Sequence, residues 1–274
     1  MSFEPLPPRS PREPMFNAPT VLVILIAVLV LIHVGRIFLG EEADFRLVLD
    51  FGFIPARFLV GLDPEWLAAV AEHIAEEDGE GAGQRLILAR IVLGPGDWKP
   101  WTLLTYAFLH GSWLHLAFNS LWLLAFGSPV ARRFGPARFL LLFAVCAVAG
   151  AAAHLVSHPY DLLPVVGASG AISGCMAAAV RFAFQPSRPL SMLHHERDAA
   201  DMQPAPPLGV IVRDRRAATF LVVWFATNIA LGLGSVPGPE GVSIAWEAHV
   251  GGFLAGLVLF RLFDPVPRSP ATKV

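Results

Sequence analysis

The sequence predicts an all-α fold, a polytopic membrane protein whose 274 residues form one bundle of six transmembrane helices. Two observations support this prediction. Hydrophobic residues make up 55% of the chain and charged residues only 15%, whereas about 25% of the residues in a soluble domain are charged. The apolar residues also gather in blocks near the roughly 20 residues that a helix needs to cross a bilayer. A soluble domain of this size would need a more charged surface.

The N-terminal part is expected to supply a tail and the first span. Residues 1–16 are rich in proline and arginine, which predicts a disordered cytoplasmic tail. Residues 20–39 are apolar apart from His33 and Arg36. The length of this block, and the lack of a convincing cleavage site of small residues, favour a retained span over a signal peptide.

Residues 40–100 are too polar to cross a membrane and predict a long external loop. Within it, Trp66, Val70 and Ile74 recur every four residues with acidic residues on the other faces. This spacing predicts an amphipathic helix that lies at the membrane surface or against the bundle. The apolar run 86–93 is too short to cross.

Five further spans complete the bundle. With the first span they make residues 17–264 a single membrane domain, whose core covers 101–263, and residues 265–274 are expected to form a second cytoplasmic tail. The spans are expected at 101–126, 139–156, 167–184, 217–233 and 244–263.

The distribution of basic residues predicts the orientation. Six crossings place both termini on one side, and the segments on that side hold 14 of the 20 lysines and arginines. The positive-inside rule therefore puts both termini in the cytoplasm, and we expect a bacterial inner membrane protein in contact with lipid. The net charge of −2 indicates no nucleic-acid partner. Cys146 and Cys175 lie in apolar blocks without metal-binding spacing, which predicts packed, inert thiols, no metal and no cofactor.

Polar residues inside the apolar blocks are the candidates for function. Such groups are costly in hydrocarbon and usually face the bundle interior or a hydrated cavity. A single one is more often a hydrogen-bonding contact between helices than a catalyst, and this is how we interpret Asn228 and Ser173. The remaining candidates are His115 and Asn119 in the second span, Ser169 in the fourth and His249 in the sixth.

Ser169 and His249 are predicted to meet. Ser169 opens the fourth span within a run that contains Gly167, Gly170 and Gly174, beside the N–H groups and positive dipole of a helix start. His249 shares one face of its helix with Gly252 and Gly256, and two faces smoothed by glycine can approach closely. Each candidate precedes an arginine, Arg181 or Arg261, by 12 residues. At about 1.5 Å per residue this places both roughly 10 Å below the outer surface.

A hydroxyl beside an imidazole suits nucleophilic catalysis, because the neutral ring accepts the hydroxyl proton and later returns it to the leaving amine. No carboxylate is well placed to orient His249, since Glu247 points elsewhere, so we predict a dyad. His115 and Asn119 lie one turn apart and could form an oxyanion hole with the Ser169 N–H. Hydrolysis needs water, which predicts a hydrated pocket open to the outside.

At these residues the chain resembles the rhomboid family of intramembrane proteases. The likeness runs from about 101 to 263 and rests on three motifs, which are individually weak but specific when found in this order on spans two, four and six. They are the His-x4-His-x3-Asn pattern of His110, His115 and Asn119, the Gly-x-Ser-Gly motif at 167–170, and Ala-His-x-x-Gly-x-x-x-Gly at 248–256.

The resemblance implies a rhomboid-like bundle with Ser169 as nucleophile, His249 as base, and His115, Asn119 and the Ser169 amide as the oxyanion hole. It also implies transmembrane protein substrates and a partly embedded lateral loop at 40–100. Two positions depart from the family pattern. Thr102 stands where arginine often follows Trp101, and Ser173 stands where an aromatic ring commonly packs beneath the catalytic histidine.

Other classes fit less well. The nucleophile elbow of an α/β-hydrolase needs a strand before the serine and a glycine at position 171, which is alanine. A zinc protease of the His-Glu-x-x-His type is excluded because no such run occurs. A rhomboid-like pseudoprotease would generally lack the serine or the histidine, and a transporter would show several embedded charges and repeat symmetry.

Overall fold

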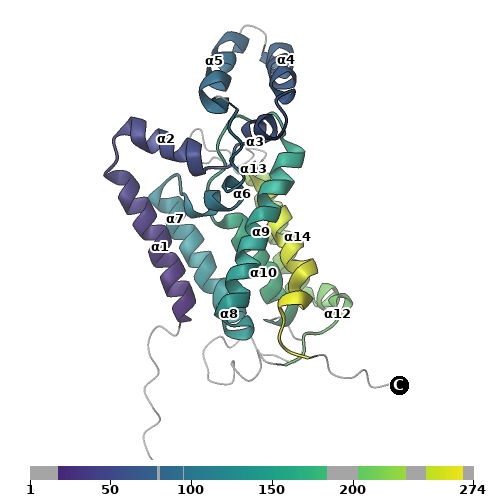
Figure 1. Ribbon diagram of the computed structural model, residues 1–274. Helices are drawn as coiled ribbons and strands as arrows, with labels where there is room; N and C mark the ends of the chain where they lie inside the picture. Colours follow the sequence, from purple (N-terminus) through teal and green to yellow (C-terminus); the bar gives the residue numbers. More distant parts are fainter. Residues whose placement is uncertain (1–17, 79–80, 95, 184–202, 233–244, 268–274) are drawn as a thin grey trace, which may run out of the picture.

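The computed structural model describes residues 18–78, 81–94, 96–183, 203–232 and 245–267 (Figure 1). Within them the chain is helical, and its only β pairing is an isolated bridge between Phe53 and Val165. The predicted all-α fold class is confirmed. The predicted N-terminal tail and most of the predicted C-terminal tail lie outside the described residues.

Helices occupy each of the six positions where spans are predicted (Figure 1). Among the described residues, four runs are long and apolar enough to cross a membrane, and they make the chain an integral membrane protein. These are α1 (Thr20–Ile37), the run Trp113–Phe134, α9 (Pro136–Ser157) and α14 (Trp246–Phe263). The remaining two predicted spans correspond to α10 (Ser169–Ala183), a shorter apolar helix, and α13 (Arg215–Gly232). α13 begins with two arginines and follows the short α12 (Leu208–Arg213).

The second crossing helix begins 12 residues later than the sequence predicts, at Trp113 rather than at 101. Ser112 is extended and its hydroxyl accepts the His115 N–H at 3.1 Å, which caps the helix at this point. The crossing run is continuous through α7 (Trp113–Trp122), a π-helical turn (Leu123–Gly127) and α8 (Ser128–Phe134). The segment before it forms α6 (Thr102–Thr105) and a 3₁₀ turn (Tyr106–Phe108).

Residues 40–100, the predicted external loop, fold into four helices beyond the end of the bundle at which α1 ends and α14 begins, which is the predicted outer end (Figure 1). The predicted amphipathic helix is confirmed, because Val70 and Ile74 are buried in a small apolar cluster that also receives residues of the next helix. The four helices are α2 (Glu41–Phe51), α3 (Pro55–Leu62), α4 (Trp66–Asp78) and α5 (Ala82–Leu93).

Side chains just before the second crossing helix tie this loop to the bundle. The indole N–H of Trp101 donates to the Asp50 carbonyl at 2.9 Å, and the Thr105 hydroxyl donates to the Phe51 carbonyl at 2.7 Å. Both acceptors lie at the C-terminal end of α2, where helix carbonyls lack partners within the helix. Thr102, the departure from the family pattern, is buried and donates to Lys99.

Arg36 joins α1 to both neighbouring segments. Its guanidinium donates to both carboxylate oxygens of Asp44 on α2 and to the His110 carbonyl at 2.8 Å. The hydrogen bonds from Arg36 hold the pKa of Asp44 below its ordinary value. One side chain therefore links the end of the first span to α2 and to the segment just before the second crossing helix.

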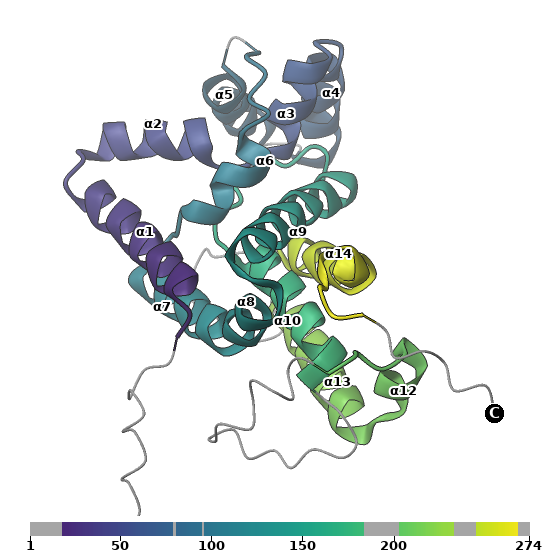
Figure 2. The ribbon, with the colours of Figure 1, turned by 60° about the horizontal axis from the view of Figure 1, so that its bottom comes forward.

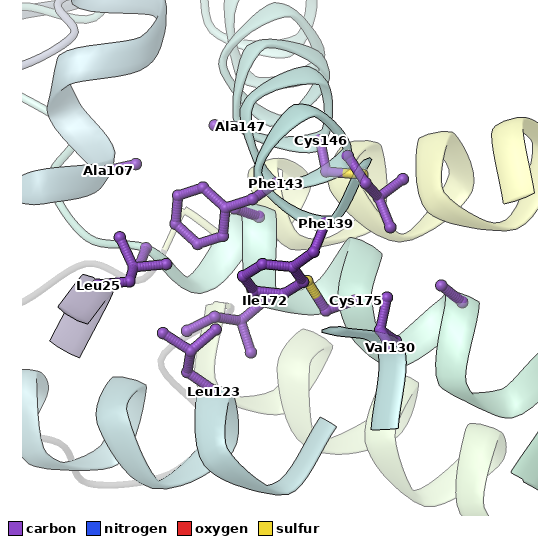
Figure 3. Packing of buried hydrophobic residues seen from close by; sticks show 14 of the residues in the cluster. Leu25, Ala107, Leu123, Val130, Phe139, Phe143, Cys146, Ala147, Ile172 and Cys175 are labelled. Carbon is purple, nitrogen blue, oxygen red and sulfur yellow. The ribbon is translucent and has the colours of Figure 1, made fainter. Parts of the chain in front are cut away.

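The apolar core lies between α1, α7, α9 and α10 (Figure 3). Leu25, Leu123, Phe139 and Ile172 meet there from different helices, and Cys146 and Cys175 are buried as free thiols.

The inner end of α14 is fixed by charged groups. The guanidinium of Arg133 on α8 donates to both carboxylate oxygens of Asp264, at 2.8 and 2.9 Å, and lies over the ring of Phe182. Arg181, which is predicted from the sequence to mark the cytoplasmic edge, is itself buried beside Phe260.

Glycines bring α10 and α14 into backbone contact. α10 lies at the centre of the bundle, with α1 and α7 on one side and α13 on the other (Figure 2). A methyl group on Gly252 would lie 1.9 Å from the carbonyl oxygen of Gly170, and one on Gly256 would lie 2.2 Å from that of Gly174. The helices can be this close only because neither position has a side chain.

This contact predicts that Gly252→Ala strongly destabilises the chain. The added methyl must push α10 and α14 apart, and overpacking of this kind typically costs about 1–3 kcal/mol. The matched control is Gly35→Ala on α1, where an added methyl meets nothing within 4 Å. Thermal unfolding of the purified chain in detergent should show a lower Tm for Gly252→Ala than for Gly35→Ala. Equal Tm values would contradict the contact.

Candidate active site

Ser169 begins α10 directly after a backbone turn that only glycine adopts easily. Gly167 has φ +119°, and its N–H donates to the Tyr106 carbonyl at 2.9 Å. A methyl at position 167 would lie 2.7 Å from the imidazole of His115. The turn therefore places Ser169 at a helix start and lets the ring of His115 approach the same point.

His249 reaches Ser169 from the first turns of α14. Its Nε2 lies 2.7 Å from Ser169 Oγ, although the two residues are 80 positions apart in the sequence. Both side chains are partly exposed, as is that of His115. The serine hydroxyl can donate to the ring nitrogen and remain open to a reactant.

Asn228 on α13 holds the other nitrogen of the same ring. Its Oδ1 is hydrogen-bonded to His249 Nδ1, and its Nδ2 donates to the Trp224 carbonyl at 2.8 Å. A carbonyl can only accept, so the amide NH₂ must face Trp224 and Oδ1 must face the ring. A neutral His249 then carries its proton on Nδ1 and presents a lone pair on Nε2 to Ser169.

The sequence does not predict this role. Asn228 is an interhelical contact, as interpreted, but its partner is the candidate base. The prediction of a dyad rests on the lack of a well-placed carboxylate, whereas an amide oxygen accepts the same N–H. The available signal was a polar residue in the fifth span, which packs beside the sixth.

His115 and Asn119 lie one turn apart on α7, and the Asn119 Nδ2 donates to the His115 carbonyl at 2.9 Å. Asn119 is buried, and this bond uses one of its two amide hydrogens. His110 is buried before α7, with its ring edge-on to that of His115 at a centroid distance of 5.2 Å. His110 thus packs against the imidazole that faces Gly167, and Asn119 is bonded to the backbone of the same histidine.

Ser173 bonds within its own helix rather than between helices. Its hydroxyl donates to the Ser169 carbonyl at 2.7 Å, so the interpretation of Ser173 as an interhelical contact is wrong. Aromatic contacts near His249 come from α13 instead, where Trp224 and Phe225 contact Phe253 of α14 at centroid distances of 5.0 and 5.4 Å. α13 therefore supplies a polar contact to His249 and aromatic contacts one turn further along α14.

The sequence is also similar to a known protein family and to several known proteins. The family model of the rhomboid domain matches residues 97–264. The rhomboid protease GluP of Bacillus subtilis is 44% identical over 87 residues, which are 32% of this chain and 16% of that protein. The rhomboid protease GlpG of an Enterobacter species is 29% identical over 168 residues, or 61% of this chain and 50% of that protein.

A plant protein is also similar. RHOMBOID-like protein 4 of Arabidopsis thaliana is 26% identical over 174 residues, which cover 64% of this chain and 36% of the plant protein. The chain thus spans half or less of the length of these three relatives. The family model nevertheless covers more than half of the chain, and it includes both Ser169 and His249. The chain belongs to the rhomboid family.

Proposed function

We propose that the chain is an intramembrane serine endopeptidase that cleaves transmembrane protein substrates with a Ser169–His249 dyad. The observation that carries the proposal is the 2.7 Å contact between Ser169 Oγ and His249 Nε2 at the start of a buried helix. The names of the relatives, which include rhomboid proteases of two bacteria, support the same reaction.

In the first half of the reaction, Ser169 Oγ attacks the carbonyl carbon of the substrate peptide bond. His249 Nε2 takes the hydroxyl proton during the attack and then gives it to the leaving amine as the C–N bond breaks. The product is an acyl-enzyme ester on Ser169. Water attacks this ester, again losing a proton to His249, and the acid is released as Ser169 regains its hydrogen.

The tetrahedral intermediate needs donors for its negatively charged oxygen. The Ser169 N–H lies at the start of α10, where backbone N–H groups lack partners within the helix and the helix dipole is positive. His115 lies against Gly167, two residues before the nucleophile, and could supply a second donor. Asn119 has one amide hydrogen left for this purpose after its bond to His115.

Asn228 acts in this proposal as a positioning residue. It selects the His249 tautomer whose Nε2 can accept the serine proton, and it acts through the ring without touching the substrate. The hydrogen bond from Asn228 would hold the His249 ring in place of the aromatic side chain that the family pattern commonly has at position 173.

The substrates we propose are membrane proteins with a transmembrane helix that unwinds easily near the outer face. The dyad lies toward the end of the bundle at which α14 begins and α1 ends (Figure 1). With both termini in the cytoplasm of a bacterium, as the basic residues predict, this is the external end of the bundle. A hydrated opening there would supply the water that the second half of the reaction consumes.

Replacing either member of the dyad should abolish proteolysis. Ser169→Ala removes the nucleophile and His249→Ala removes the base, so neither purified variant should cleave a transmembrane substrate in proteoliposomes. A fluorophosphonate probe should label the wild type but not Ser169→Ala. Circular dichroism checks that the variants fold. Cleavage at the wild-type rate by either variant would overturn the dyad, and a binding protein of the same fold would not react with the probe at Ser169.

Replacing Asn228 with an apolar residue of similar size should slow the chemical step. Asn228→Leu removes one hydrogen bond to His249, worth about 1 kcal/mol, so kcat should fall roughly fivefold while KM stays near the wild-type value. Asn228→Asp keeps an oxygen that can accept from Nδ1 and should recover part of kcat. A wild-type kcat for Asn228→Leu would contradict the positioning role. So would a fall in kcat that is the same in Asn228→Leu and Asn228→Asp and is matched by the same fall in Tm.

The oxyanion donors should contribute unequally. One such donor typically contributes a factor of about 10²–10³ in kcat, and we expect His115→Ala to lose more than Asn119→Ala because the Asn119 amide already donates to the His115 carbonyl. The rate of single-turnover cleavage is measured for both variants, with Ser169→Ala as the inactive reference. The assignment fails if both variants turn over as fast as the wild type.

A further inference from the structure

A second cluster of ionisable groups lies at the outer ends of α9 and α14. His154 Nδ1 is 3.4 Å from one carboxylate oxygen of Glu247, and His158 Nδ1 is 3.7 Å from the other. We propose that His154, His158 and Glu247 bind one divalent transition-metal ion, of which zinc fits the ligands best. This site is separate from the dyad and goes beyond the proposed protease function.

His154 is the strongest reason to expect a ligand. It is only 5% exposed, and neither of its ring nitrogens has a hydrogen-bond partner within the described part of the chain. Burying a polar group without a hydrogen-bond partner is unfavourable. Its Nδ1 faces the Glu247 carboxylate, so a cation between the two would remove that cost.

The distances suit a tetrahedral ion. Zinc binds histidine nitrogen at about 2.0–2.1 Å, which places neighbouring ligand atoms about 3.4 Å apart. One ligand atom from each of the three residues can be chosen so that all lie within 4.8 Å of one another. The rings of His154 and His158 are stacked with centroids 5.0 Å apart, as expected for residues four apart at a helix end. Small rotations of these side chains would bring the three ligand atoms within coordination distance of one ion.

Asp161 supplies the outer contact that metal-binding histidines usually have. Its Oδ2 lies 3.6 Å from His154 Nε2, on the opposite side of the ring from Glu247. A histidine bound through one nitrogen commonly donates its other N–H to a carboxylate, which fixes the ring and strengthens the ligand. Asp161 is placed to accept that hydrogen.

The ligand types favour zinc over the hard cations. Calcium and magnesium take oxygen ligands, whereas two imidazoles and a carboxylate suit zinc and leave a fourth position for water. The side chain of His158 is 48% exposed, which gives the ion a route from solvent.

The ion would connect the end of α9 to the first turn of α14. Glu247 lies in that turn, two residues before His249. Zinc bound there should therefore raise the thermal stability of the chain.

Zinc binding is tested on the full chain purified in detergent with a tag free of histidine. We use the Ser169→Ala background, so that the result is independent of proteolysis. After removal of metals with a chelator, equilibrium dialysis against zinc chloride and elemental analysis should give one zinc per chain. His158→Ala and Glu247→Gln should lose this stoichiometric zinc. Asp161→Asn should weaken binding by about 10–100-fold, as for other outer contacts.

Two histidine variants serve as controls. His73→Ala removes another outer histidine, whose ring stacks on Tyr160, and His249→Ala removes the imidazole of the dyad. Both should retain one zinc, and zinc should raise the Tm of each but not that of His158→Ala. The proposal is overturned if the wild-type ligand set binds no stoichiometric zinc, if His158→Ala binds as before, or if His249→Ala alone abolishes binding.

Discussion

The close approach of α10 and α14 is the constraint on which the rest of the structure depends. Gly252 and Gly256 of α14 lie against the backbone of Gly170 and Gly174, with no space for a methyl group. The serine begins one of these helices and the histidine lies one turn before Gly252 on the other. The helix separation therefore sets the distance between hydroxyl and imidazole.

Other contacts hold the two helices in that arrangement. At the inner end, the ion pair of Arg133 with Asp264 fixes the end of α14 to α8. At the outer end, the turn before α10 is tied to the external loop through the bridge between Phe53 and Val165. The start of α10 is thus held at one end of the bundle by the 40–100 segment, and the end of α14 is held at the opposite end by α8.

The polar groups between the helices form a connected chain from α13 to α10. Trp224 orients Asn228, Asn228 selects the tautomer of His249, and His249 faces Ser169. Polar groups in a membrane bundle persist where each finds a partner, because an unpaired one is costly there. Orienting the base with a neutral amide avoids burying a carboxylate. Glu247 instead points to His154 and His158 at the outer end of α9, so the one acid near His249 in sequence serves a different cluster.

The sequence by itself determined the class of fold, the approximate positions of the spans and the pairing of Ser169 with His249. These follow from local information, since span length, glycine spacing and polar residues in apolar blocks can all be counted along the chain. The Asn228 contact and the cluster of His154, His158 and Glu247 were decided only by the tertiary structure. Each depends on how helices distant in sequence rotate against one another, and hydrophobic periodicity does not specify that rotation when a helix is apolar on every side.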